Sequence, residues 1–250
     1  MPASNTILLL GGTAEAYSLA EELNLLKIPV LSSLAGRTKY PRLPVGRYRI
    51  GGFGGINGLV DTIRNEHINL IIDATHPFAE TMTDHAWRAA EIANINYIRF
   101  ERPIWQQQAG DRWQTVHSLD EAVDAIPENS RCFLAIGRQH LSPFLSRKDV
   151  HFVARMVDLP DDLVPEKNIE IMLAKPGSLE EECKFLNDNK FDTMACRNSG
   201  GSASYQKLQA AREVQLQVIM INRKPLPNIL SFNSESALID HVVQFLTHRI

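Results

Sequence analysis

Cysteine is scarce in this chain of 250 residues, since only Cys132, Cys183 and Cys196 are present and no two of them form a C-x-x-C pair. An odd number of widely spaced cysteines argues against a disulfide framework and a structural zinc site. The chain also lacks an apolar run of about 20 residues, the length that a membrane span needs, and its N-terminus lacks the pattern of a signal peptide. We therefore expect a reduced, cytoplasmic protein with no membrane partner.

Positive charge is not in excess. The chain has 26 Lys and Arg against 29 Asp and Glu, a formal net charge of −3, whereas nucleic-acid-binding proteins normally carry a basic surplus. We expect no nucleic-acid partner. The sequence also contains no G-x-S-x-G, no P-loop and no H-E-x-x-H pattern, so hydrolase, P-loop kinase and zinc-protease interpretations lack their motifs and no metal site is predicted.

What the sequence does contain is a repeated alternation of short apolar runs and helical segments. In the first half the predicted strands are 6–10, 29–34, 48–51, 70–74 and 97–100, and the predicted helices are 14–26, 55–66 and 79–93. Strands that are apolar throughout are typical of parallel sheets covered on both faces. Strand–helix–strand repetition predicts right-handed crossovers and an α/β fold.

The alternation pauses at 104–112, which has no usable periodicity and several turn-forming residues. It then resumes with predicted strands at 131–136, 149–155, 193–196 and 218–221 and predicted helices at 119–125, 179–187, 205–214 and 235–246. We therefore predict two domains, an N-terminal dinucleotide-binding α/β domain at 1–103 and a C-terminal α/β domain at 113–250.

A glycine turn follows the first predicted strand. Gly11, Gly12 and Thr13 lead directly into a helix that begins with Ala14 and Glu15. Glycine lets the backbone approach a ligand closely, and a helix N-terminus offers N–H groups and partial positive charge, so the segment can cradle a phosphate. The pattern is not G-x-G-x-x-G, however, and tight strand-to-helix turns use glycine without any ligand.

The segment after the second predicted strand indicates which dinucleotide would bind. It runs from Ser33 through Gly36 and Arg37 to Thr38 and contains no carboxylate. Many NAD enzymes place an acidic residue here for the ribose hydroxyls, whereas NADP enzymes place an arginine near the 2′-phosphate. We predict NADPH as the cofactor. NADH stays possible because Arg37 could instead bind a substrate carboxylate or be a solvated surface charge.

Three other segments are candidates for ligand binding. Four glycines surround Phe53 at 51–55, and the flanking Arg42, Arg47 and Arg49 suit a polyanionic ligand. A second nest of glycines follows a strand at 197–202 and could hold cofactor or substrate carboxylates. At 73–79 a buried strand ends in polar residues and Pro77. His76 in this turn could donate a proton near neutral pH, or could serve only to cap the following helix.

Taken together, these segments resemble the precorrin-6A reductase family, which includes the cobalt-precorrin-6A reductases of cobalamin (vitamin B12) biosynthesis. The resemblance rests on ILLLGGTAEA (7–16), SLAGRT (33–38), RIGGFGGINGL (49–59), DATHPFAETM (73–82), RFERPIW (99–105), AIGRQHL (135–141) and NSGGSASYQKLQAAREVQLQVIMINRKP (198–225). It implies reduction of one double bond in precorrin-6A or cobalt-precorrin-6A by hydride from a reduced nicotinamide, giving the dihydro (6B) product. It also implies two Rossmann-like parallel-sheet domains with a ligand cleft between them.

Matching positions and the chemistry of these segments together give three sets of candidate site residues. The cofactor-binding set is Gly11, Gly12, Thr13, Glu15, Ser33, Gly36, Arg37, Thr38, Thr75, His76 and Pro77. The residues that face a carboxylate-rich corrinoid substrate are Gly52, Phe53, Gly54, Arg197, Asn198, Ser199, Gly200 and Gly201. The candidate catalytic residue is His76, as the proton donor. A water molecule or an acidic substrate tautomer would serve that role equally, and no protein partner is indicated.

Two rival functions use the same features. One is an unrelated NADPH-dependent reductase, although the chain has no Tyr-x-x-x-Lys pair of the short-chain dehydrogenases. The other is a non-catalytic, two-lobed sensor of nucleotides or anions. Both would bind NADPH, but only a reductase would oxidise it when the macrocycle is supplied.

Overall fold

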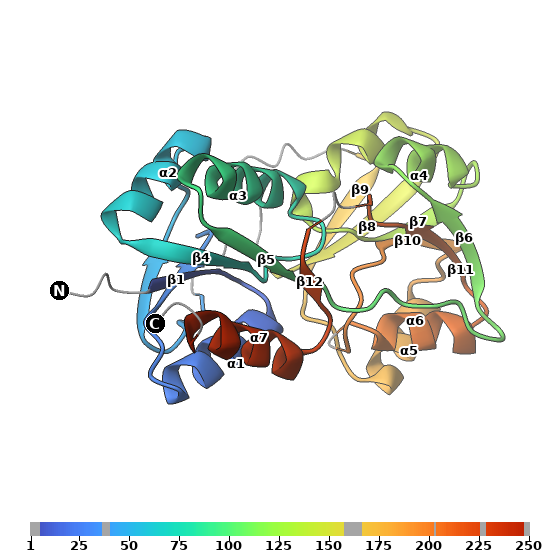
Figure 1. Cartoon of the computed structure of the whole chain (residues 1–250). Coiled ribbons are helices and arrows are strands. Elements are labelled where there is room, and N and C mark those ends of the chain that lie inside the picture. The colour runs from blue at the N-terminus through green and yellow to red at the C-terminus, as the bar shows by residue number, and fades with distance from the viewer. Residues whose placement is uncertain (1–5, 37–40, 158–166, 203, 226–228, 248–250) are drawn as a thin grey trace. The chain divides into compact units, whose positions relative to one another are not determined.

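The computed structural model describes residues 6–36, 41–157, 167–202, 204–225 and 229–247 (Figure 1). The chain divides into two compact units. Unit 1 contains residues 1–103 together with 226–250, and unit 2 contains residues 104–225. Each unit has a six-stranded sheet in which every pairing is parallel. The α/β class predicted from the sequence is confirmed.

Unit 1 has the strand order of a Rossmann fold. Its sheet runs β12-β5-β4-β1-β2-β3, which matches the order 3-2-1-4-5-6 when β12 takes the sixth place. The strands are β1 (Thr6–Leu10), β2 (Val30–Leu34), β3 (Arg47–Ile50), β4 (Ile68–Asp73), β5 (Asn96–Phe100) and β12 (Ser231–Phe232). The helices are α1 (Ala14–Leu25), α2 (Gly55–Asn65), α3 (Glu80–Ala93) and α7 (Glu235–Thr247).

Helices cover both faces of this sheet, with α1 and α7 on one face and α2 and α3 on the other (Figure 1). Side chains of a strand alternate between faces. Ile7 and Leu9 of β1 therefore join the core under α1 and α7, while Leu8 and Leu10 join the core under α2 and α3. Because both faces are covered, β1 is buried along its whole length, as its unbroken apolar sequence predicts.

Unit 2 is a second parallel layer with the order β6-β11-β10-β7-β8-β9. Its strands are β6 (Arg112–Val116), β7 (Arg131–Ala135), β8 (His151–Met156), β9 (Ile169–Leu173), β10 (Thr193–Arg197) and β11 (Gln217–Ile221). Its helices are α4 (Leu119–Ala125), α5 (Leu179–Asp188) and α6 (Gln206–Glu213), with two 3₁₀ turns at Arg138–His140 and Ser142–Ser146. Phe133, Met194 and Leu208 are central residues of its core.

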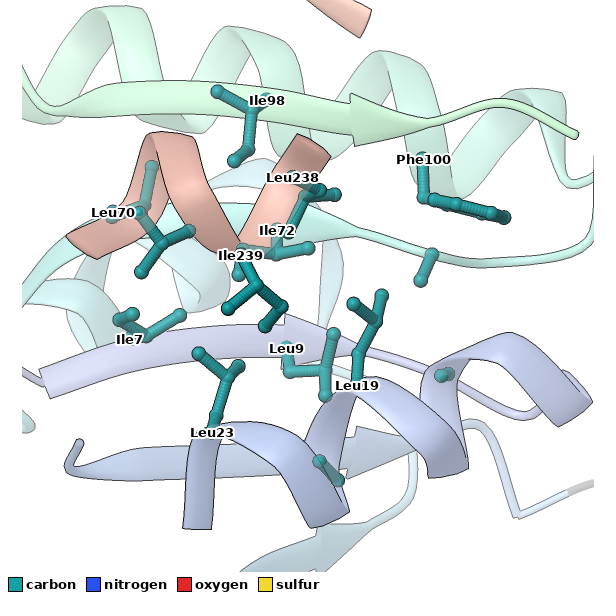
Figure 2. Close-up of a cluster of buried hydrophobic side chains, with 14 residues drawn as sticks. Ile7, Leu9, Leu19, Leu23, Leu70, Ile72, Ile98, Phe100, Leu238 and Ile239 are labelled. Atoms are coloured by element: carbon teal, nitrogen blue, oxygen red, sulfur yellow. The ribbon is translucent and has the colours of Figure 1, made fainter. Parts of the chain in front are cut away.

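The C-terminal segment corrects the domain range predicted from the sequence. Residues 226–250 were expected to belong to the second domain, 113–250, but they lie in unit 1. The short strand β12 pairs in parallel with β5, with Phe232 opposite Phe100. Helix α7 packs beside α1, and Leu238 and Ile239 lie in the same apolar cluster as Ile72 of β4 (Figure 2).

Three strands were not predicted, namely β6, β9 and β12. Strands β6 and β9 are the outer strands of their sheet, and β12 is an outer strand of the other. Outer strands are partly exposed, so they lack the continuous apolar sequence that marks a buried parallel strand. No helix among the described residues is long and apolar enough to cross a membrane.

The packing of α7 predicts that unit 1 depends on the end of the chain. Leu238 is 0% exposed, whereas Val243 on the same helix is 38% exposed. Leu238→Ala should lower the free energy of unfolding by about 2–5 kcal/mol, because it leaves a cavity between α7 and the sheet. Urea denaturation followed by circular dichroism measures this change. Val243→Ala is the matched control and should shift stability by at most about 0.5 kcal/mol. Equal effects of the two substitutions would contradict the packing.

Candidate functional site

A cavity of about 620 Å³ opens at the carboxyl edge of the unit 1 sheet. Its walls come from the segments that follow β1, β2, β3 and β4 and from the first turns of α3. In open α/β sheets ligands bind at this edge, where the strand order reverses, and here the reversal lies between β1 and β4. The volume lies within the range of about 300–1,000 Å³ that small-molecule sites occupy.

The turn after β1 presents its backbone to this cavity. Gly12 has a φ of +107°, a conformation that side chains rarely adopt, and a Cβ built on it would meet no atom within 4 Å. Hydrogen bonds hold this turn on both sides. The Gly11 N–H donates to the Ser33 carbonyl oxygen at 3.0 Å, and the Thr13 hydroxyl donates to the Ala74 carbonyl oxygen at 2.8 Å. Thr13 also caps α1 by accepting from the Ala16 N–H, so an anion here would face a fixed helix N-terminus.

Arg49 of β3 organises the opposite wall. Its Nη1 donates to the Ser33 hydroxyl oxygen and to the Gly51 carbonyl oxygen, both at 3.0 Å, and its Nη2 donates to the Gly52 carbonyl oxygen at 2.8 Å. The guanidinium carbon lies 3.9 Å from the centre of the Phe53 ring, a cation–π contact. Partial burial lowers the pKa of Arg49. One side chain therefore holds the glycine-rich loop in place.

A buried polar network supports the third wall. The Asp73 carboxylate, at the end of β4, is fully buried. It forms an ion pair with Nη1 of Arg99 on β5 and accepts hydrogen bonds from the Tyr97 hydroxyl at 2.7 Å and the Thr83 hydroxyl at 2.8 Å. It also accepts from both the N–H and the hydroxyl of Thr75, at 3.0 and 2.7 Å. Thr75, which lines the cavity, is thus held by a group that lies outside it.

The network keeps Asp73 ionised. Burial alone would raise the pKa of this carboxyl, but the Arg99 charge and the hydrogen bonds of Thr75 and Tyr97 outweigh it and hold the pKa below its usual range. Burial, together with the neighbouring Asp73 charge, raises the pKa of Tyr97. Because the folded pKa of Asp73 is lowered, its contribution to stability is complete above about pH 4 and is lost as the pH falls through the folded pKa.

His76 follows Thr75 and also lines the cavity. The Phe78 N–H donates to Nδ1 of its ring at 3.3 Å, and the His76 carbonyl oxygen accepts from the Ala79 N–H at 2.7 Å. A ring nitrogen that accepts a hydrogen bond carries no proton, so the neutral ring has its proton on Nε2. The turn therefore fixes both the orientation and the tautomer of the imidazole.

Comparison with known proteins places the chain in a family. The model of the family described as "Precorrin-6x reductase CbiJ/CobK" matches residues 6–247. The chain belongs to this family.

Individual relatives agree with that assignment. A precorrin-6A reductase of Rhodococcus erythropolis is 39% identical over 223 residues, which are 88% of this chain and 90% of the relative. A cobalt-precorrin-6A reductase of Priestia megaterium is 29% identical over 231 residues, 87% and 90% of the two chains. The solved structure of a CobK precorrin-6A reductase covers 96% of both chains with a TM-score of 0.90 at 36% identity. The predicted family and its two Rossmann-like domains are confirmed.

The structure brings most of the predicted unit 1 residues to one cavity. The lining includes Gly11, Gly12, Ser33, Gly36, Gly52, Phe53, Gly54, Thr75 and His76. Three predicted cofactor-binding residues, Thr13, Glu15 and Pro77, are not among the lining residues. Thr13 instead supports the turn, and Glu15 pairs with Arg102 at 3.2 Å. Arg37 and Thr38 lie outside the described residues.

The predicted residues of unit 2 lie at the end of β10 and directly after it, and at least one of them has a structural role. The Asn198 side chain is buried. Its carbonyl oxygen accepts from the Trp105 N–H at 2.8 Å, and its amide nitrogen donates to the Trp105 carbonyl oxygen at 3.0 Å and to Asn222. Both amide hydrogens are therefore used by partners within unit 2, and a substrate contact of Asn198 stays a prediction. The Gly201 carbonyl oxygen accepts from the Trp105 indole at 2.8 Å.

The polar network behind Thr75 was not predicted from the sequence. Its members Thr83, Tyr97 and Arg99 are scattered over α3 and β5. One signal was present in the sequence, since Arg99 interrupts a strand that is otherwise apolar between Tyr97 and Phe100. A charge within such a strand is costly to bury unless a partner neutralises it, which predicts a nearby carboxylate.

The network predicts a measurable cost for losing one hydroxyl. Tyr97→Phe removes a hydrogen bond to a buried, ionised carboxylate and should lower the free energy of unfolding by about 1.5–3 kcal/mol at pH 7. The control is Tyr48→Phe, because Tyr48 is 45% exposed, and its effect should stay within about 0.5 kcal/mol. Chemical denaturation measures both. A Tyr97→Phe variant as stable as the control would show that Asp73 does not need this donor.

Proposed function

We propose that this chain is a reductase of cobalamin biosynthesis that transfers hydride from a reduced nicotinamide dinucleotide to one double bond of precorrin-6A or cobalt-precorrin-6A, giving the dihydro (6B) product. The observation that carries the proposal is the cavity at the strand-order reversal of unit 1, in a chain whose family and relatives bear the name of this reaction. The corrinoid is the small-molecule partner. The widely spaced cysteines, which are free thiols, suit a cytoplasmic enzyme.

The residues present fit a dinucleotide. The open space in front of Gly12 gives room for a phosphate beside the first turn of α1. The glycine-rich wall at 51–55 lets the backbone lie close to a flat ligand. Among the described residues that line the cavity, none is acidic, so a polyanion meets no like charge there. Within the class of nicotinamide cofactors we propose NADPH, with NADH as the alternative, and Arg37 and Thr38 as further contacts.

Hydride chemistry needs no nucleophile from the protein, because the nicotinamide supplies the hydride when it is bound. The chain's own residues orient and hold the reactants. The Asp73 network fixes Thr75 and the start of the His76 turn, and Arg49 fixes the opposite loop. Reduction of a double bond also consumes a proton, and we assign its delivery to His76. To act as an imidazolium, the ring must give up the hydrogen bond from the Phe78 N–H.

Anaerobic oxidation of NADPH by the purified protein tests the proposal. Precorrin-6A and its cobalt complex are offered in separate reactions, and absorbance at the nicotinamide band is followed. We expect oxidation that depends on one of the two macrocycles, which also identifies the branch of the pathway. NADPH that binds but is not oxidised with either macrocycle would overturn the proposal in favour of a sensor or of an unrelated reductase.

His76→Ala tests the proton donor. The substitution should lower kcat by about 10²–10⁴-fold, the usual contribution of a general acid, while the dissociation constant of NADPH changes far less. The matched control is His117→Ala, which removes an exposed histidine of unit 2. Steady-state kinetics and an equilibrium titration give the two quantities separately. Unchanged turnover in His76→Ala would remove this residue from the mechanism and leave water or the substrate as the proton source.

A further inference from the structure

One side of the cavity carries a permanent positive charge. Arg42 lines the cavity together with Tyr17, Ser33 and Gly36, and it is the only arginine or lysine among the described lining residues. Ser33 and Gly36 belong to the end of β2 and the loop after it. In a Rossmann fold this is where the 2′ position of the adenosine ribose is recognised. The charge of Arg42 therefore faces the part of the cavity that distinguishes NADPH from NADH.

Arg42 is held in place by Tyr17 and Glu21, but its guanidinium group can exchange Glu21 for another anion. The Tyr17 hydroxyl donates to the Arg42 carbonyl oxygen at 2.6 Å, and the guanidinium carbon lies 4.9 Å from the centre of the Tyr17 ring. Nη2 pairs with Glu21 at 2.8 Å, but the two side chains are 67% and 51% exposed. A pair in water contributes about 0–1 kcal/mol, so a phosphate dianion, which forms stronger charge-assisted hydrogen bonds, can replace Glu21.

Ser33 adds a directed donor. Its hydroxyl oxygen accepts from Nη1 of Arg49 at 3.0 Å, and the same guanidinium is fixed by the Gly51 and Gly52 carbonyl oxygens. Because Arg49 has only donors, the Ser33 hydrogen points to another acceptor. A phosphate oxygen is such an acceptor. The described lining residues offer no carboxylate, the group that accepts from the free ribose hydroxyls of NADH.

We propose that Arg42 and Ser33 bind the 2′-phosphate of the cofactor and so select NADPH over NADH, and that Arg49 is a positioning residue that directs the Ser33 hydroxyl. This inference rests on the proposed function, since it assumes that the cavity takes a nicotinamide dinucleotide. It adds the residues that recognise the 2′-phosphate group. Glu21 becomes the anion that occupies Arg42 when no cofactor is bound.

Two nucleotide fragments test the inference without any turnover. Adenosine 2′,5′-bisphosphate carries the 2′-phosphate and adenosine 5′-monophosphate does not, so the ratio of their dissociation constants isolates that group. In calorimetric titrations Arg42→Gln should raise the dissociation constant of the bisphosphate by about tenfold or more, the fold-change expected for a lost charge-assisted hydrogen bond. The dissociation constant of the monophosphate should change less than about twofold. Arg47→Gln is the control, because Arg47 is exposed and pairs with Glu66. Equal changes for both fragments, or none, would overturn the role of Arg42.

Glu21→Gln gives a test in the opposite direction. Without its carboxylate competitor, Arg42 should bind the bisphosphate about two- to fivefold more tightly, which is the size of one exposed ion pair, and the monophosphate should not change. Weaker or unchanged bisphosphate binding would contradict the exchange of Glu21 for the phosphate. The gain should also shrink as salt is added, because the pair is exposed.

A double-mutant cycle tests the positioning role of Arg49. Ser33→Ala should lower the ratio of affinities for the two fragments, and Arg49→Gln should lower it too. If Arg49 acts through Ser33, Arg49→Gln should change the ratio no further in a Ser33→Ala background, and Arg49→Lys should restore part of it. Full additivity of the two substitutions would refute the coupling. Thermal unfolding of each variant shows that it is folded.

The fragments also separate this inference from the proposed function. Neither fragment contains a nicotinamide, so fragment binding does not depend on hydride transfer. If the protein binds the bisphosphate through Arg42 but never oxidises NADPH with a macrocycle, this inference stands and the reductase function is refuted. The opposite outcome is also possible to recognise. If the protein oxidises NADPH with a macrocycle, and its preference for NADPH over NADH is unchanged by Arg42→Gln, the reductase function stands and this inference is refuted.

Discussion

The buried ion pair between Asp73 and Arg99 joins the carboxyl ends of β4 and β5 at a place that water does not reach. Removing one partner from such a pair typically costs about 3–5 kcal/mol, because the other charge is left buried and uncompensated. The pair is surrounded by hydroxyl and N–H donors from α3, β5 and the turn after β4. The cavity wall at Thr75 therefore has a fixed position before any ligand arrives, and such preorganisation favours the correct orientation of a bound ligand.

The same edge of the sheet depends on residues far along the chain. After Pro103 the chain builds the whole of unit 2, and only then do residues 226–250 return to unit 1. There β12 extends the sheet beside β5, and the Glu101 N–H donates to the Phe232 carbonyl oxygen at 2.7 Å. One face of the unit 1 sheet is covered only when helix α7 packs against it. Unit 1 therefore requires the two ends of the sequence together.

The elements that the sequence predicted well are those whose signal is local. Strand β1 and the start of α1 were predicted at their observed bounds, because an apolar run ends at Gly11 and Gly12 and Thr13 is a natural helix cap. The glycine segments after β1, β2 and β3 line one cavity in unit 1, although the sequence assigned the first two to the cofactor and the third to the substrate, and these assignments stay predictions. The location of α7 was not predictable, since an apolar stripe does not say which sheet it covers. The hydrogen bonds of the Asn198 amide were not predictable, because its partners Trp105 and Asn222 are distant in sequence. Arg37 and Thr38 stay predictions.

A crystal structure of the protein with NADP⁺ tests most directly whether the cavity of unit 1 holds the dinucleotide. We expect the phosphates beside Gly12 at the N-terminus of α1, the adenosine ribose beside Ser33, and the nicotinamide between the glycine-rich loop and Thr75. A dinucleotide bound to unit 2, or outside the cavity at the carboxyl edge of the first sheet, would contradict the assignment of this site and of the residues that form it.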